Sequence, residues 1–330
     1  NGQPPVQAFA RVIAEPVIRL ASIDCGTRTE LGDWEQLLDF RRVASEFALA
    51  KAALALSGLT ADSGLTIPDT RLRETLEAFG GGIELTTLAA VPKGSGLGTS
   101  SIMGAVLLAV LDRVMGRATE PQQLFHRVLQ LEQAMTTGGG WQDQIGGVTD
   151  GVKLITTAPG MVPDAVVEYL PGEIIEPAEN GGQTLLYYTG ITRLAKNILE
   201  QVVGRYLDRD RATVTTLGRI GALASRAAGA MARRDLAELG RSVGTAWLLN
   251  KRLDPGSSNP AVEDLQDRIR PYVHGAKLLG AGGGGFLLII CRSAEAAQEL
   301  RVDLESNPPN PRARFFQYSL NHEGLRVTAC

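Results

Sequence analysis

Apolar positions fall into two kinds of run along the chain, which predict short strands and longer helices in mixed order. Runs rich in aliphatic and β-branched residues are typical of strands, and they cover 6–13, 17–23, 83–91, 152–156, 185–189, 286–291 and 312–318. Apolar residues at helical spacing, or in Ala/Leu-rich runs, predict helices over 47–56, 102–111, 121–135, 192–206, 261–272 (interrupted near Pro271) and 294–304, and a helical hairpin over 212–249 that is broken near 233–235. Residues 158–182 contain Pro, Gly and acidic residues and are predicted as an edge region or a connection between domains.

A glycine-rich loop lies between the predicted strand 83–91 and the predicted helix 102–111. Its three glycines alternate in sequence, at Gly94, Gly96 and Gly98. At a helix N-terminus, such a loop offers backbone N–H donors and the positive end of the helix dipole to an anion, typically phosphate. The next three residues are types that cap helix N-termini, namely Thr99, Ser100 and Ser101. The alternative interpretation is therefore a glycine-rich turn followed by capping hydroxyls.

Two familiar nucleotide-binding motifs do not fit this loop. The P-loop ends in Gly-Lys-Ser/Thr, whereas here Thr99 follows Gly98, and Lys93 lies before the glycines. The dinucleotide fingerprint would require a glycine at position 99. If the loop holds phosphate, it does so with a different motif.

A carboxylate borders the apolar face of the predicted helix 121–135. The face is formed by residues at helical spacing, namely Leu124, Val128, Leu131 and Met135, and Glu132 lies four residues after Val128. A carboxylate in that position is costly unless it has a partner. It is either a boundary residue whose charged end reaches water or a functional group.

Two further glycine-rich segments follow. In residues 136–147, glycines flank Trp141 and Asp143, a composition that suits a loop folded tightly against a ligand better than a core. A surface loop is the alternative, although Trp141 is large and favours burial. The second segment, residues 280–285, directly precedes a continuous apolar run that predicts a buried strand.

Composition narrows the function classes. A chain of 330 residues predicts about two domains, and a net charge of −3 gives no electrostatic reason to expect nucleic acid or an acidic membrane as a partner. The three cysteines (Cys25, Cys291 and Cys330) are far apart, so neither a disulfide framework nor a zinc site is expected. This cysteine usage makes a reducing cytosol the simplest location, so we expect a cytoplasmic protein. The sequence shows no membrane-spanning apolar run and no signal peptide.

The order of these features resembles that of the GHMP small-molecule kinases. In that family a phosphate loop comes first, followed by a metal-binding Glu, a catalytic Asp at similar spacing, and a late glycine-rich motif. Four segments resemble the L-fucokinase branch, including the kinase half of bifunctional fucokinase/GDP-fucose pyrophosphorylases: 136–151, 187–193, 277–285 and 307–315. The Gly-Gly-Trp-Gln-Asp-Gln core at 139–144 is shared with heptose 7-phosphate kinases, so this core does not choose the sugar.

The resemblance implies an α+β fold of two lobes. The N-terminal lobe, over 1–157, would be like ribosomal S5 domain 2 and bind ATP, and the C-terminal lobe, over 183–330, would be ferredoxin-like. An earlier family motif, roughly Pro-x-Arg-x-x-x-x-Gly-Gly, is not found, and residues 15–23 look similar but lack the two glycines. We therefore expect an N-terminally truncated L-fucokinase domain that lacks its first strands, with any pyrophosphorylase activity on the parent or a separate chain.

The resemblance also implies roles for individual residues. The phosphates of ATP would be held by the loop residues Lys93, Gly94, Ser95, Gly96, Leu97, Gly98, Thr99, Ser100 and Ser101. Ser100 and Glu132 would ligate Mg²⁺, and Asp143 would accept the proton of the anomeric hydroxyl of L-fucose. Substrate contacts would come from Gly140, Trp141, Asp143, Arg193, Gly282 and Gly283. Trp141 as a hydrophobic plug, Arg193 as a surface ion pair and Lys93 as a solvated residue remain alternatives.

Three other functions stay open at this point. A D-glycero-D-manno-heptose 7-phosphate kinase differs from a fucokinase in its sugar. A non-catalytic sugar- or nucleotide-binding protein of the same fold is favoured by the missing first motif and disfavoured by the presence of Ser100, Glu132 and Asp143. A decarboxylase of the mevalonate type is the most distant alternative, because its loop does not resemble residues 136–147.

Overall fold

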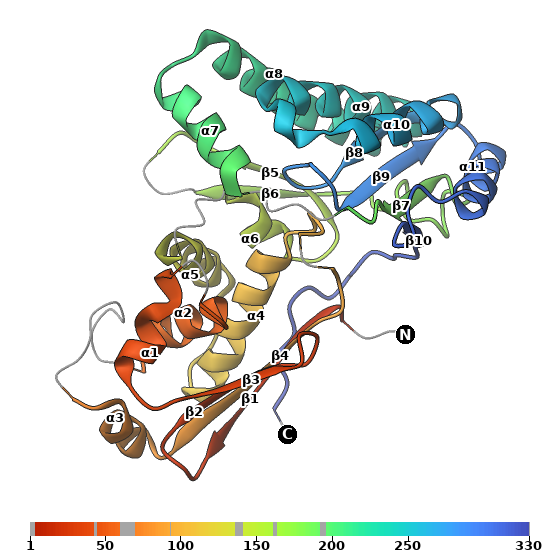
Figure 1. Ribbon diagram of the computed structural model, residues 1–330. Coiled ribbons are helices and arrows are strands. Elements are labelled where there is room, and N and C mark those ends of the chain that lie inside the picture. Colours follow the sequence, from red (N-terminus) through yellow and green to blue (C-terminus); the bar gives the residue numbers. More distant parts are fainter. Residues whose placement is uncertain are drawn as a thin grey trace. The chain divides into compact units, whose positions relative to one another are not determined.

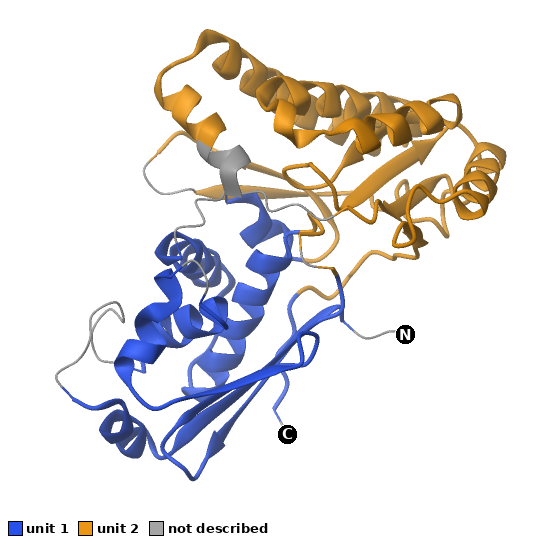
Figure 2. Cartoon of the chain, viewed as in Figure 1, with its two compact units in different colours: residues 1–91, 98–149, 325–330 blue, residues 92–97, 150–324 orange. Residues whose placement is uncertain are grey.

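The computed structural model describes residues 4–42, 45–59, 70–92, 94–135, 141–160, 164–191 and 196–329; for 196–200 only the backbone is described. The chain forms two compact units, one comprising residues 1–91, 98–149 and 325–330 and the other residues 92–97 and 150–324 (Figure 2). Each unit combines a four-stranded sheet with helices, which confirms the α+β class. Within the described ranges, no helix is both long and apolar enough to cross a membrane.

The first unit is built on a mixed sheet with strand order β1-β4-β2-β3. Its strands are β1 (Val6–Ile13), β2 (Ile18–Ser22), β3 (Thr27–Leu31) and β4 (Gly82–Ala89). Strand β4 pairs antiparallel with β1 and parallel with β2, so the segment before the glycine loop lies inside the sheet. The loop therefore starts from a fixed strand end.

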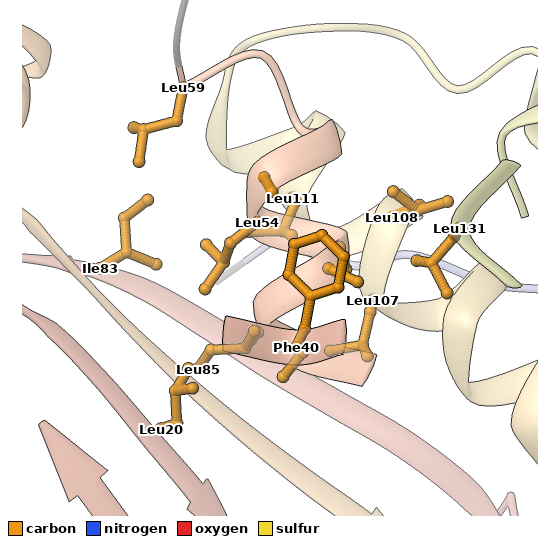
Figure 3. Packing of buried hydrophobic residues seen from close by; sticks show 14 of the residues in the cluster. Leu20, Phe40, Leu54, Leu59, Ile83, Leu85, Leu107, Leu108, Leu111 and Leu131 are labelled. Atoms are coloured by element: carbon orange, nitrogen blue, oxygen red, sulfur yellow. The ribbon is translucent and has the colours of Figure 1, made fainter. Parts of the chain in front are cut away.

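Helices cover one face of this sheet (Figure 1). They are α1 (Trp34–Leu38), α2 (Ala48–Leu56), α3 (Leu72–Phe79), α4 (Thr99–Val114), α5 (Pro121–Ala134) and α6 (Gln142–Gly146). Figure 3 shows the core between these layers, where Leu20 and Leu85 of the sheet lie among Leu54, Leu107 and other helix residues. Helix α4 is central to this core, which fixes the position of its N-terminus.

The second unit contains an antiparallel sheet with strand order β10-β7-β9-β8 and a separate hairpin of β5 with β6. The strands are β5 (Val152–Thr157), β6 (Ala165–Leu170), β7 (Thr184–Tyr188), β8 (Val273–Leu278), β9 (Phe286–Cys291) and β10 (Arg314–Phe316). The central strand β9 is buried along almost its whole length, as its continuous apolar run predicts.

Helices of the second unit pack in two groups. They are α7 (Lys196–Leu207), α8 (Arg211–Ala232), α9 (Leu236–Leu253), α10 (Pro260–Ile269) and α11 (Ala294–Ser306). One apolar cluster joins α10 and α11 to the sheet, and a second, containing Ile290, joins it to α8 and α9. Leu287 and Ile290 of β9 belong to different clusters because alternate strand residues point to opposite faces.

Most elements appear where the apolar pattern predicts them, and three differences are informative. Strand β6 lies inside the predicted edge region 158–182, because pairing with β5 completes a hairpin. Strand β8 lies in a segment for which the apolar pattern predicted neither a helix nor a strand. The predicted helix start at Thr192 falls outside the described residues, and the described helix begins at Lys196.

Candidate active site

The glycine loop ends at the N-terminus of helix α4. The predicted capping role of Thr99, Ser100 and Ser101 is wrong, because Gly98 is the N-cap residue, with φ of 65°, and no side chain caps the helix. Gly94 and Gly96 also have positive φ, of 69° and 77°, which glycine adopts without strain.

Backbone N–H groups at this helix end are available to a ligand. Among the described residues, none accepts a hydrogen bond from the N–H groups of Gly96, Leu97 or Gly98. Gly98 is the N-cap residue of the 16-residue helix α4, so its N–H lies at the positive end of the helix dipole. The arrangement suits an anion such as phosphate.

The first half of the loop belongs to the second unit, where it packs on the other glycine-rich segment. Phe286 N–H donates to the Ser95 carbonyl oxygen at 3.0 Å. A Cβ atom placed on Gly96 would lie 2.2 Å from the carbonyl oxygen of Leu279, and one placed on Gly285 would lie 2.4 Å from that of Ser95. Both positions require glycine, because backbone meets backbone there.

Two other glycines of this segment pack on the loop that precedes helix α10. The Gly283 N–H donates to the Ser257 carbonyl oxygen at 2.5 Å, and the Gly283 carbonyl oxygen accepts from Asn259 Nδ2 at 3.0 Å. A Cβ atom on Gly282 would lie 2.5 Å from the same Ser257 oxygen. These contacts give both glycines a structural role, and their predicted contact with substrate stays a prediction.

Glu132 is held in a buried hydrogen-bond network within the first unit. Ser101 Oγ donates to Glu132 Oε1 at 2.5 Å, and Gln144 Nε2 donates to Glu132 Oε2 at 2.5 Å. All three side chains are buried, so the interpretation of Glu132 as a boundary residue that reaches water is wrong. Burial raises the pKa of Glu132, the two hydrogen bonds oppose that rise, and the charge of nearby Asp143 adds to it.

Asp143 lies beside the end of the glycine loop. It occupies the first turn of α6, where its carbonyl oxygen accepts a hydrogen bond from the Gly147 N–H at 2.9 Å. A Cβ atom on Gly98 would lie 3.2 Å from Asp143 Cγ, so the side chain packs directly against the loop. Asp143 keeps a solvent-exposed face, yet the surrounding protein desolvates the carboxylate enough to raise its pKa.

The structure thus joins the two predicted carboxylates to the start of one helix. Glu132 reaches Ser101 of α4, and Asp143 packs on Gly98, so residues from α4, α5 and α6 meet at one place in the first unit. Ser100, the predicted metal ligand, is exposed on the first turn of α4. Trp141 is half-buried immediately before α6.

Some predicted site residues lie outside the described part of the chain, and the sequence did not predict two residues that contact Glu132. Lys93, Gly140 and Arg193 are not among the described residues. The contacts of Ser101 and Gln144 with Glu132 were not predicted, because they join residues 31 and 12 positions apart. The only sequence signal for Gln144 is its place directly after Asp143.

Two family models match separate parts of the chain. Residues 70–151 match the family model "GHMP kinases N terminal domain", and residues 227–310 match "GHMP kinases C terminal". The chain is 42% identical over 328 residues to the L-fucokinase/L-fucose-1-P guanylyltransferase of Bacteroides fragilis, covering 99% of this chain and 34% of that protein. It is 36% identical over 284 residues to the bifunctional fucokinase/GDP-fucose pyrophosphorylase of Arabidopsis thaliana, covering 86% of this chain and 26% of that protein.

A solved structure shows the same fold. The galactokinase of Lactococcus lactis, in complex with galactose, superposes with a TM-score of 0.67 at 15% identity, covering 95% of this chain and 84% of that one. The chain spans about a third of the length of the curated relative from Bacteroides and about a quarter of that from Arabidopsis.

Proposed function

Because the chain belongs to the GHMP kinase family, we propose that it transfers the γ-phosphoryl group of ATP to the anomeric hydroxyl of L-fucose. The products are L-fucose 1-phosphate and ADP. The 42% identity to a protein named as an L-fucokinase supports this choice of sugar. The observation that supports the reaction type is the meeting of Glu132 and Asp143 at the N-terminus of α4, where the Gly98 N–H has no acceptor among the described residues.

The triphosphate of ATP binds the loop 93–101 and the first turn of α4. Backbone N–H groups of Gly96, Leu97 and Gly98 have no other acceptor among the described residues. Fixed donors at a helix N-terminus stabilise the charge on the phosphates without reorganising during the reaction.

Mg²⁺ is the metal whose chemistry fits this place. A carboxylate and a hydroxyl are suitable oxygen ligands, and Mg²⁺ commonly keeps several waters besides one or two protein groups. Glu132 and Ser100 would hold the ion, and Ser101 and Gln144 orient the Glu132 carboxylate. The bound metal neutralises phosphate charge, which is the main requirement of phosphoryl transfer.

Asp143 is the general base. Its carboxylate accepts the proton of the sugar hydroxyl as the new O–P bond forms and the bond between Pγ and the bridging oxygen of ATP breaks, which releases ADP. Burial raises the pKa of Asp143, which makes the carboxylate a stronger base than a solvated aspartate. A positioned base of this kind contributes about 10²–10⁴-fold to the rate.

The remaining contacts with L-fucose are assigned to Gly140, Trp141, Arg193, Gly282 and Gly283. Trp141 directly precedes helix α6, which carries Asp143, and its side chain is only partly buried, so that it can stack on an apolar face of the sugar. We further propose a cytoplasmic enzyme whose product serves a GDP-fucose pyrophosphorylase on the parent or a separate chain, as the names of both relatives suggest.

A coupled assay of ADP release tests the proposal on this chain. L-fucose is compared with D-glycero-D-manno-heptose 7-phosphate, and Asp143→Asn with the matched control Asp264→Asn, an exposed aspartate on α10. We expect ADP release with L-fucose, a loss of at least about 100-fold in Asp143→Asn with ATP binding intact, and no change in the control.

Each contrary outcome removes a different part of the proposal. Release with the heptose alone would replace the sugar. ATP binding without release for either sugar would identify a non-catalytic binding protein. Near-normal turnover in Asp143→Asn would remove the assigned base.

A further inference from the structure

A groove of about 540 Å³ lies within the second unit, between helices α9 and α10 and the start of strand β8. Its volume is in the range of small-molecule sites. Helix α9 approaches β8 closely because glycines face each other: a Cβ atom on Gly240 would lie 2.5 Å from His274 Cβ, and one on Gly275 would lie 1.9 Å from the Gly240 carbonyl oxygen. This approach brings side chains of α9 alongside His274.

Positive charge dominates one end of the groove. Arg241 of α9, His274 of β8 and Arg292, which directly follows β9, all line it. Arg292 Nε donates to the Val273 carbonyl oxygen at 3.0 Å, which fixes its guanidinium at the start of β8. Arg241 shares the single carboxylate of Glu238 with Arg226.

The carboxylates that line the groove do not balance this charge. Glu263 is paired with Lys251 at 2.8 Å, and Asp267 is paired with Arg270. Among the described residues, no carboxylate forms an ion pair with Arg292. The end formed by Arg241, His274 and Arg292 therefore keeps an excess of cationic groups.

The groove also contains buried donors without acceptors. Within the described part of the chain, Ser242 Oγ, Trp247 Nε1 and Gln266 Nε2 make no hydrogen bond, although all three residues line the groove. Ser242 and Trp247 are each only 3% exposed. These atoms are buried beneath the groove surface, so the charge of Arg241, His274 and Arg292 is the feature that a ligand in the groove would meet.

We propose that this groove binds a phosphate monoester of a small organic molecule, with its phosphate held by Arg241, His274 and Arg292. Arg241 donates from Nε and Nη2 to Glu238, and Arg292 donates from Nε to the Val273 carbonyl oxygen, so their remaining guanidinium N–H groups would contact the phosphate. An imidazolium adds a third charged donor. The organic part lies along the groove toward Leu248, an exposed apolar side chain that also lines it. This assignment is independent of the kinase reaction.

His274 provides a readout that is local to the groove. Its pKa is lowered first by burial and then by the charges of Arg241 and Arg292, while Asp235 at the N-terminus of α9 acts in the opposite direction. A bound phosphate dianion favours the imidazolium, so binding raises the pKa of His274. A tenfold preference of the ligand for the protonated form corresponds to a rise of about one pH unit.

The experiment is an NMR titration of the three histidine side chains of this chain. Phenyl phosphate, inorganic phosphate and sodium chloride at matched ionic strength are compared. We expect both phosphates to raise the pKa of His274 with saturation, phenyl phosphate to bind more tightly, and the exposed His126 and His322 to respond no more than they do to the salt.

Variants separate a built site from general screening. Arg292→Gln, and independently Arg241→Gln, should weaken phenyl phosphate binding at least tenfold, whereas Arg219→Gln, which removes an exposed arginine from α8, should not. Folding of each variant is checked by circular dichroism. Because the two groove variants are independent, either one that folds is enough to test the proposal. An unchanged His274 titration, an equal effect of sodium chloride, equal affinity for the two phosphates, or equal binding in a folded groove variant would overturn the proposal.

Discussion

Removal of the Ser101 hydroxyl isolates the energetic role of the buried network around Glu132. In Ser101→Ala, Glu132 Oε1 loses a 2.5 Å hydrogen bond, while Gln144 Nε2 still donates to Glu132 Oε2. A hydrogen bond to a charged group contributes about 1.5–3 kcal/mol. The higher helix propensity of Ala on α4 offsets about 0.5 kcal/mol of that loss. We therefore expect the first unit to lose about 1–2.5 kcal/mol at neutral pH.

The stability lost in Ser101→Ala should depend on whether the side chain at position 132 is charged. Glu132→Gln keeps the shape of the side chain. Gln144 Oε1 has no partner among the described residues, and after rotation of the Gln144 amide it can accept a hydrogen bond from the new amide at position 132. The Ser101 hydrogen bond is then neutral and contributes only about 0.5–1.5 kcal/mol. A double-mutant cycle should give a coupling of about 1 kcal/mol between the two positions.

The same reasoning gives a sign for the pH dependence. Burial raises the folded-state pKa of Glu132 above its ordinary value of 4.5, so its contribution to stability is present below that value and is lost as pH rises through the folded pKa. The Ser101 hydrogen bond lowers this pKa. The penalty of Ser101→Ala should consequently be small near pH 4 and full at neutral pH.

Urea unfolding followed by tryptophan fluorescence measures these values. The measurement uses a Trp247→Phe background, because Trp247 belongs to the second unit whereas Trp34 and Trp141 belong to the first. A penalty below about 0.5 kcal/mol at neutral pH, or an equal penalty with and without Glu132→Gln, would refute a charge-assisted hydrogen bond in the core.

Three further predictions concern the base and the glycines. The acid limb of kcat/KM for L-fucose should have an apparent pKa above 3.8, because burial raises the pKa of Asp143; a limb at or below 3.8 would contradict its role. Gly98→Ala should lower kcat more than tenfold, because φ is 65° and the new Cβ meets Asp143. The control is Gly116→Ala, where φ is 71° and the Cβ would meet open space. Equal kcat values in the two variants would contradict the packing of Asp143 on Gly98. Gly285→Ala should destabilise the second unit by at least about 1 kcal/mol more than Gly182→Ala, because the new Cβ at 285 meets the Ser95 carbonyl oxygen, whereas the Cβ at 182 meets open space at a similar φ. Equal urea midpoints of the two variants would exclude this backbone clash.

The sequence predicted those elements whose burial follows a simple period. Strand β9 reads as one apolar run because both of its faces are covered, and α5 shows a buried stripe through Leu124, Val128 and Leu131. Strand β8 could not be found in this way. Its Gly275 and Lys277 interrupt the apolar pattern, and the glycine is needed because helix α9 packs on the strand there.

The sequence suggested candidate site residues but not the contacts between them. The glycine loop and the spacing of Glu132 and Asp143 identify a family, and that resemblance supplied the roles. The burial of Glu132 depends on hydroxyl and amide groups that come from α4 and α6, and no local pattern encodes such a meeting. The prediction of a hydroxyl cap on α4 was wrong because Gly98, with positive φ, occupies the N-cap position that Ser, Thr, Asn or Asp usually occupies.

The first unit is assembled from separated stretches of chain. Leu325 joins its core from near the C-terminal end of this sequence, and the Leu325 N–H donates to the Val148 carbonyl oxygen at 3.0 Å, two residues after the helix that carries Asp143. During synthesis, this contact must wait until the whole of the second unit has left the ribosome. A nascent chain halted anywhere before residue 325 would therefore lack the Leu325 side chain on the core of its first unit and the hydrogen bond to Val148.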